Sequence, residues 1–185
     1  KDGEYIRDSY ILLAPSLEAL PSQEHLKQVV AGFARRLIDL KNAEVFSEEY
    51  NGPVLFENEA VRQVLTDNLL GNNGGLCTCR MPLGVKETTT SFEDKIGKKL
   101  LDPRLSVVNY SSMTEYMNIP LLGSYEVDAE GVVPEKELVL VEKGVLKKVL
   151  NGQVPTNKVR YSTGSSRFIP TRNDVIYVTA PCTLH

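Results

Sequence analysis

The chain has 185 residues, a length that favours one domain of ordinary size or a piece of a longer protein. Hydrophobic residues make up 42% and charged residues 24%, so the chain can bury a sizeable core and wholesale disorder is excluded. Lys and Arg number 21 against 24 Asp and Glu, and the net charge of -3 offers no basic excess for a phosphate backbone. We therefore expect no direct nucleic-acid partner.

The sequence also argues against a membrane location. No apolar run reaches the roughly 18 to 20 residues that cross a bilayer, because the longest, residues 10–14, stops at Pro15. The first residues lack the basic and apolar segments of a signal peptide. Three cysteines are an odd number in a chain too large to need disulfide staples, which favours a reducing compartment. We expect a cytoplasmic protein with no membrane contact.

The first quarter of the chain predicts a strand and a helix. Residues 4–14 are rich in β-branched and aromatic side chains, which is typical of a strand. Ser22 is a suitable N-cap for a helix that follows it. Apolar side chains then recur at spacings of three and four, on one helical face: Leu26, Val29, Val30, Phe33, Leu37 and Leu40.

The middle of the chain predicts two short strands, a second helix and a loop. Residues 43–46 and 53–56 are expected to be strands on either side of a turn at residues 51–52. Residues 57–70 predict an amphipathic helix that ends at Gly71. The small and polar residues 71–91 that follow are typical of a loop.

The second half predicts antiparallel strands. Residues 105–110 are strand-like, and two apolar runs within residues 138–150 flank Lys143 and Gly144, which indicates a hairpin with Gly at a positive-φ position. Residues 174–179 predict the last strand. Because helices come early and antiparallel strands late, we predict an α+β fold, with residues 1–185 as a single domain.

The small number of histidines limits the catalytic and metal sites that this chain can form, since only His25 and His185 are present. Neither has neighbours that suggest a nucleophile–base pair. Three sulfurs and one imidazole could together form a set of four zinc ligands: Cys77, Cys79, Cys182 and His185. The spacing of the first two is tighter than the two to four residues usual in structural zinc sites, so free cysteines are the favoured interpretation.

Residues 50–60, Tyr-Asn-Gly-Pro-Val-Leu-Phe-Glu-Asn-Glu-Ala, resemble the TldD/PmbA family, also called modulators of DNA gyrase, whose larger members are zinc-dependent proteases. Further matching segments follow in the family's order: residues 95–100, 128–134, 139–146 and 161–164, and then Arg167. The resemblance covers the family's C-terminal domain. It implies that the family's separate N-terminal domain is absent from this chain.

The resemblance also marks where a zinc motif would lie. In the proteolytic members the first matching segment leads into a helix that carries His-Glu-x-x-x-His, with two zinc ligands and a general base. Placed without gaps, the motif falls on Thr66, Asp67 and Gly71. Thr and Gly cannot replace imidazole as zinc ligands. The resemblance therefore implies no catalytic residue, no bound metal and no cofactor in this chain.

This pattern is similar to the PmbA (TldE) side of the family, whose members lack the motif and pair with the proteolytic subunit. It implies a non-catalytic protein that assists proteolysis of unfolded peptides or maturation of peptide antibiotics, with extended peptides as substrates. The implied assembly is a homodimer, or a heterodimer with a TldD-like zinc protease subunit that carries the zinc. Two alternatives stay open: an active zinc metallopeptidase with relocated ligands, and a purely structural interaction module.

Overall fold

The computed structural model describes residues 7–70, 74–78, 90–170, 172 and 174–185. The chain divides into two compact units, Lys1–Val54 and Leu55–His185. Helices come first along the chain and mostly antiparallel strands follow, so the predicted α+β class is confirmed. None of the described helices is both long enough and apolar enough to cross a membrane.

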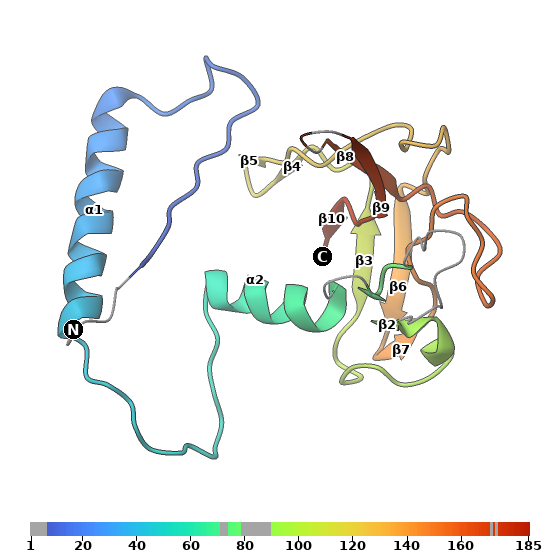
Figure 1. The fold of residues 1–185 in the computed structure, drawn as a ribbon, viewed down its shortest axis with the longest axis horizontal. Helices are drawn as coiled ribbons and strands as arrows, with labels where there is room; N and C mark the ends of the chain where they lie inside the picture. The colour runs from blue at the N-terminus through green and yellow to red at the C-terminus, as the bar shows by residue number, and fades with distance from the viewer. Residues whose placement is uncertain (1–6, 71–73, 79–89, 171, 173) are drawn as a thin grey trace. The chain divides into compact units, whose positions relative to one another are not determined.

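The first unit contains helix α1 (Gln23–Asn42), as the sequence predicted. The Ser22 hydroxyl caps it by accepting a hydrogen bond from the backbone N–H of His25 at 3.3 Å. No residue of α1 is buried, and its predicted apolar face is only partly covered, with Val30 65% exposed. The extended segment around residues 8–12 runs beside α1 (Figure 1). Side chains of this segment and of the apolar face of α1 together line a hollow.

The three strands predicted before residue 57 are wrong. The described part of residues 4–14 is extended without a partner strand, and residues 4–6 lie outside the described part. Residues 43–46 and 53–56 also form no strand. Val45, Phe46 and Leu55 are each at least three-quarters exposed, so these apolar runs have no face to pack against. A two-stranded hairpin without such a face is marginal in water.

The second unit begins with the predicted helix of residues 57–70, in two parts. Helix α2 (Glu59–Leu65) is α-helical, and η1 (Thr66–Leu70) continues it as a π-helix. The carbonyl of Leu69 accepts a hydrogen bond from the backbone N–H of Leu76 at 2.7 Å. A β-carbon on Gly75, which has φ +66°, would lie 2.1 Å from that same carbonyl oxygen. The helix end is therefore fixed against the chain that returns beside it.

A four-stranded antiparallel sheet forms the centre of the second unit, in the order β10 (Thr183–Leu184), β3 (Val107–Tyr110), β6 (Glu137–Glu142), β7 (Val145–Leu146). Lys143 and Gly144 join β6 to β7 with φ of 46° and 79°, as the predicted hairpin requires. The predicted strand at residues 105–110 is confirmed as β3.

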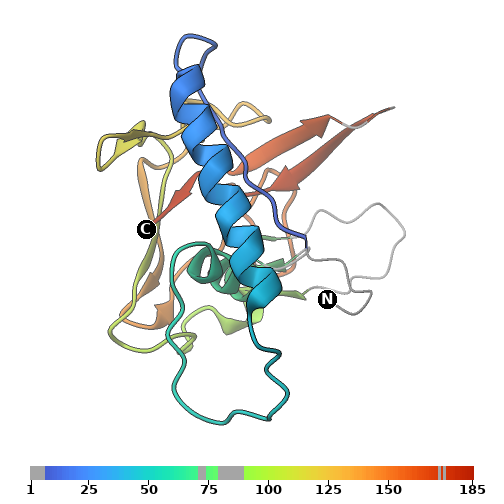
Figure 2. The same cartoon turned by 90° about the vertical axis from the view of Figure 1, so that its left-hand side faces the viewer.

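Three two-stranded pairings complete the fold: β1 (Gly74–Gly75) with β2 (Thr90–Ser91), β4 (Glu115–Tyr116) with β5 (Ile119–Pro120), and β8 (Ser166–Pro170) with β9 (Val175–Thr179). A short 3-10 helix, η2 (Phe92–Lys95), follows β2. Strand β9 was predicted, whereas its partner β8 was not. Figure 2 shows β8 and β9 side by side as a long hairpin.

The hydrophobic core lies on the central sheet and the segments that cover it. Its fully buried members come from β6, from β7 and from the segments around them: Leu76, Leu138, Leu140, Val141, Leu146, Val149, Leu150 and Val159. Leu76 and Leu150 are joined by backbone hydrogen bonding, since the Leu150 N–H donates to the Leu76 carbonyl at 2.7 Å. The end of the second helix is thereby tied to the core.

Candidate functional site

The positions that the resemblance assigned to a zinc motif lie at the end of the second helix. Thr66 is half-buried and Asp67 is exposed, both in η1, while Gly71 lies outside the described residues. Residues five apart in an α-helix point in directions roughly 140° apart, given 3.6 residues per turn. A π-helix, with its i→i+5 hydrogen bonds, brings such residues onto one face. The π-helix holds the first two motif positions, Thr66 and Asp67, and ends at Leu70.

The residues present at these positions do not fit a zinc ion. Zinc in proteins is held by cysteine, histidine, aspartate or glutamate. Of Thr66, Asp67 and Gly71, only Asp67 carries such a ligand. Across residues 7–70, 74–78, 90–170, 172 and 174–185, no group of three or more His, Cys, Asp or Glu side chains could hold a metal ion. We therefore derive no chemical step through zinc bound to this chain.

The alternative ligands are not brought together among the described residues. Cys77 is buried in the hydrophobic core, and Cys79 lies outside the described part. Cys182 is a half-buried thiol that donates to the Gly123 carbonyl at 2.8 Å. His185 is exposed, 3.4 Å from the Tyr116 hydroxyl through Nε2.

A buried polar network stands beside the core. Asn151 is 1% exposed, and its Oδ1 accepts a hydrogen bond from the Thr78 hydroxyl at 2.6 Å. Its amide nitrogen donates to the Tyr161 carbonyl at 2.8 Å, and its backbone N–H donates to the Thr163 hydroxyl at 2.7 Å. These bonds join the segment after β1 to the segment before β8. Buried polar groups with all partners in place rigidify a structure.

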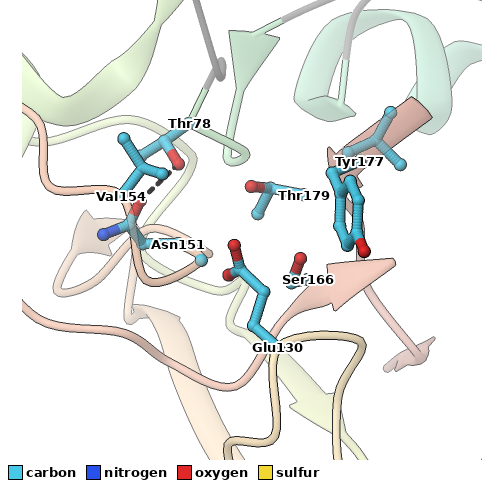
Figure 3. A pocket seen from close by; sticks show the side chains of 9 residues that line it. Thr78, Glu130, Asn151, Val154, Ser166, Tyr177 and Thr179 are labelled. Carbon is cyan, nitrogen blue, oxygen red and sulfur yellow. Dashed lines mark hydrogen bonds between the residues drawn. The ribbon is translucent and has the colours of Figure 1, made fainter. Parts of the chain in front are cut away.

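A small hollow borders this network (Figure 3). The side chains of Glu130, Ser166 and Thr179 surround the same space, with Asn151 on its other side. The free volume is about 10 Å³, enough for about one water molecule. The carboxylate of Glu130 also accepts a hydrogen bond from the backbone N–H of Gln153 at 2.6 Å. The hollow has no room for a substrate, so its polar residues serve the fold.

Asp128 fastens the turn before β6 to the β8–β9 hairpin. Its Oδ1 accepts hydrogen bonds from the backbone N–H groups of Glu130 and Val132, each at 2.9 Å. Its Oδ2 accepts one from the backbone N–H of Ser166 at 3.0 Å. Asp128 is 7% exposed, so these three donors replace the water that an exposed carboxylate would bind.

A larger hollow lies on the other side of Ser166, with a volume of about 400 Å³. Arg167 of β8 lines it, and the guanidinium carbon lies 3.4 Å from the centroid of the Tyr125 ring. The exposed apolar side chains of Leu122, Val127 and Phe168 form other parts of the wall. A cationic group, an aromatic ring and apolar walls together make a plausible binding surface.

The sequence pattern marked Arg167 and the segment that contains Asp128, but it assigned neither a role. An Asp followed by Gly three residues later is the local signal for the turn at Asp128. Arg167 and Tyr125 are 42 positions apart along the chain, so no local pattern could pair them. Asn151 carried no signal, because an asparagine before glycine is equally typical of an exposed turn.

One exposed ion pair stabilises the helix that leads to the motif positions. Glu59 and Arg62 pair through their side chains on the first turn of α2. The hydrogen bonds from Arg62 lower the pKa of the Glu59 carboxyl, and the same contact raises the pKa of Arg62. Both groups are exposed, so solvent and salt screen the interaction.

Comparison with known proteins gives one match. Residues 47–180 match the family described as the PmbA/TldA metallopeptidase C-terminal domain. No curated protein and no solved structure matches the chain. The matched residues include the second helix, strands β3, β6 and β7 of the central sheet, and all lining residues of the two hollows that Ser166 borders. Because the match spans well over half of the chain, this protein belongs to the PmbA/TldA metallopeptidase family.

Proposed function

We propose that this protein is a non-catalytic member of its family that assists a zinc-bearing, TldD-like subunit in processing unfolded peptides or peptide antibiotics. The observation that carries the proposal is the donor set at Thr66, Asp67 and Gly71, which supplies one carboxylate where a zinc protease needs two imidazoles and a base. The helical conformation of Thr66 and Asp67 supports the assignment of these two positions, because the motif of the proteolytic members lies on a helix.

The surface of the β8–β9 hairpin supports assembly with a second subunit. Phe168 pairs with Tyr177 and Ile169 pairs with Ile176, and all four side chains are between 43% and 61% exposed. Successive strand residues point to opposite faces, so the hairpin is apolar on both sides. Exposed apolar surface of this kind marks sites of protein association. A homodimer and a heterodimer would both cover it.

Metal analysis and co-purification test this proposal. The purified chain should contain far less than one zinc per molecule and show no peptidase activity, whereas a tagged copy recovered from its native cell should bring down a zinc-containing homologue. One tightly bound zinc per chain, with activity abolished by a chelator, would contradict it and favour a peptidase with relocated ligands. In that case, substituting Cys77 and Cys182 with Ser should remove the metal.

Restoring the ligands tests the assigned positions. The double variant Thr66→His/Gly71→His should bind zinc in calorimetric titration more tightly than the wild-type chain, because it adds two imidazole ligands to the carboxylate of Asp67. The single variant Thr66→His is the matched control and should gain little affinity. Equal affinities of the double and single variants would show that the motif positions are wrongly assigned.

A further inference from the structure

We propose that Arg167 binds a carboxylate group of a peptide, in the 400 Å³ hollow that it lines beside Tyr125. The choice of a peptide rests on the proposed function, whereas the choice of a carboxylate rests on the chemistry of the hollow itself. Thr66 and Asp67 lie in the second helix and do not line this hollow.

The guanidinium of Arg167 has an unpaired donor. Its Nη1 donates to the Ser166 carbonyl at 3.1 Å, while Nη2 is buried and finds no acceptor among the residues that the structure describes. An arginine side chain has five N–H donors and stays charged at any physiological pH. A buried donor on a charged group is costly to leave unpaired. An acceptor brought by a ligand would satisfy it.

No described carboxylate neutralises Arg167. No ion pair of Arg167 is found within the described part of the chain. Asp128 supplies the one carboxylate among the described residues that line the hollow, and its two oxygens already accept three backbone hydrogen bonds. The charge of the guanidinium is therefore available to a ligand.

Tyr125 holds the guanidinium in place. Its hydroxyl donates to the Gly164 carbonyl at 2.7 Å, and its backbone N–H donates to the Ser111 carbonyl at 3.0 Å. The ring is thus anchored at both ends, and the guanidinium lies against its face. Stacking on an aromatic face uses the flat side of the guanidinium, so its N–H groups, which lie in the plane of the group, point away from the ring.

The composition of the hollow favours a carboxylate over a phosphate. Arg167 is its single cationic side chain among the described lining residues. One guanidinium matches the single charge and planar fork of a carboxylate, whereas recognition of phosphate groups on proteins uses clusters of arginines. The apolar walls at Leu122, Val127 and Phe168 suit the side chains of a peptide that carries the carboxylate. That carboxylate could be the peptide's C-terminus or an acidic side chain.

Three short peptides distinguish these sources on the intact wild-type chain. They are acetyl-Ala-Leu-Phe with a free C-terminus, the same peptide with a C-terminal amide, and acetyl-Glu-Leu-Phe amide. Calorimetry should show that the free acid binds about tenfold tighter than its amide, as expected for one charge-assisted, two-bond contact. If the glutamate peptide binds as tightly as the free acid, side-chain carboxylates are accepted. If it binds like the neutral amide, the site reads the terminus.

Variants then test whether Arg167 causes the preference for the free acid over its amide. Arg167→Ala should abolish the difference between acid and amide, and Arg167→Lys should keep only part of it because an ammonium lacks the fork. Arg160→Ala, which removes an exposed arginine outside the hollow, should leave the difference unchanged. Equal binding of all three peptides by the wild-type chain, or no binding of any of them, would overturn the proposal. This result needs no zinc and no partner subunit, so it is independent of the metal analysis.

Discussion

Helix α1 and strand β6 are both predicted from regular apolar patterns, but only one of them is buried. Leu138, Leu140 and Val141 of β6 are at most 1% exposed. No residue of α1 is buried, and Val30 on its apolar face is 65% exposed. The difference teaches that periodicity specifies which face of an element is apolar, while burial depends on what the rest of the chain places against that face.

The partners of the two elements explain the difference. Strand β6 lies between β3 and β7, and segments distant in sequence close the core around it. Within its own unit, α1 lines a hollow together with the extended segment around residues 8–12. The family match likewise includes β6 and excludes α1, since it begins at residue 47. The part of the chain that matches the family therefore contains three of the four strands of the sheet and excludes the exposed helix.

The largest expected contrast comes from the same substitution in both elements. Leu140→Ala removes a fully buried side chain and should lower the free energy of unfolding of the second unit by about 2 to 5 kcal/mol. Leu40→Ala, at a position that is 45% exposed in α1, should change the free energy of unfolding of the first unit by less than about 0.5 kcal/mol. Urea denaturation followed by circular dichroism measures both. Similar losses would show that α1 packs in a core after all.

Glycine substitutions should change stability in opposite directions in the two regions. A β-carbon on Gly144 would lie 2.5 Å from the Leu101 carbonyl oxygen, at φ +79°, so Gly144→Ala should cost about 1 to 3 kcal/mol. Gly32 lies inside α1 with nothing within 4 Å of its added β-carbon. Gly32→Ala should therefore stabilise the helix by about 0.5 to 1 kcal/mol. Thermal unfolding of both variants is the measurement, and a stable Gly144→Ala protein would contradict the hairpin geometry.

The sequence predicted the local elements well where local rules decide them. The cap at Ser22, the second helix and the β6–β7 turn at Lys143 and Gly144 each depend on a few neighbouring residues, and each is confirmed. The strands predicted before residue 57 failed because strand formation depends on a partner, which no local pattern reveals. Strand β8 was missed for the same reason, as its pairing with β9 supplies its identity.

The candidate site was less predictable than the fold. The resemblance located Thr66 and Asp67 but could not show that they lie in a π-helical turn, because one extra residue per turn leaves no mark in an apolar pattern. The contact between Arg167 and Tyr125 depends on how the segment after β5 meets β8. Such long-range contacts follow from the packing of the whole unit.

Removing the cap of α1 should have a smaller effect than the core and glycine substitutions. Helix α1 depends on local interactions more than strand β6 does. Ser22→Ala removes the acceptor of the His25 N–H and should cost about 1 kcal/mol of helix stability. Ser22→Asp keeps a capping oxygen and is the matched control. Hydrogen exchange of the first-turn amides should accelerate in the alanine variant while the amides of β6 stay unchanged. Faster exchange in β6 would show that the two regions unfold together.

The smallest expected effect is electrostatic and concerns α2, which like α1 buries no residue. Arg62 lowers the pKa of Glu59 in the folded chain, so their pairing stabilises α2 above the ordinary glutamate pKa of about 4.3. That contribution is lost as the pH falls through the lower pKa of the folded state.

In an NMR titration of the Glu59 carboxyl, Arg62→Gln should raise the midpoint toward the ordinary pKa, and high salt should raise it in part. Arg104→Gln, which instead removes the partner of Asp102, should leave the midpoint unchanged. An unshifted midpoint in Arg62→Gln would mean that the pair does not persist in solution, and the start of α2 would then depend on backbone hydrogen bonds alone.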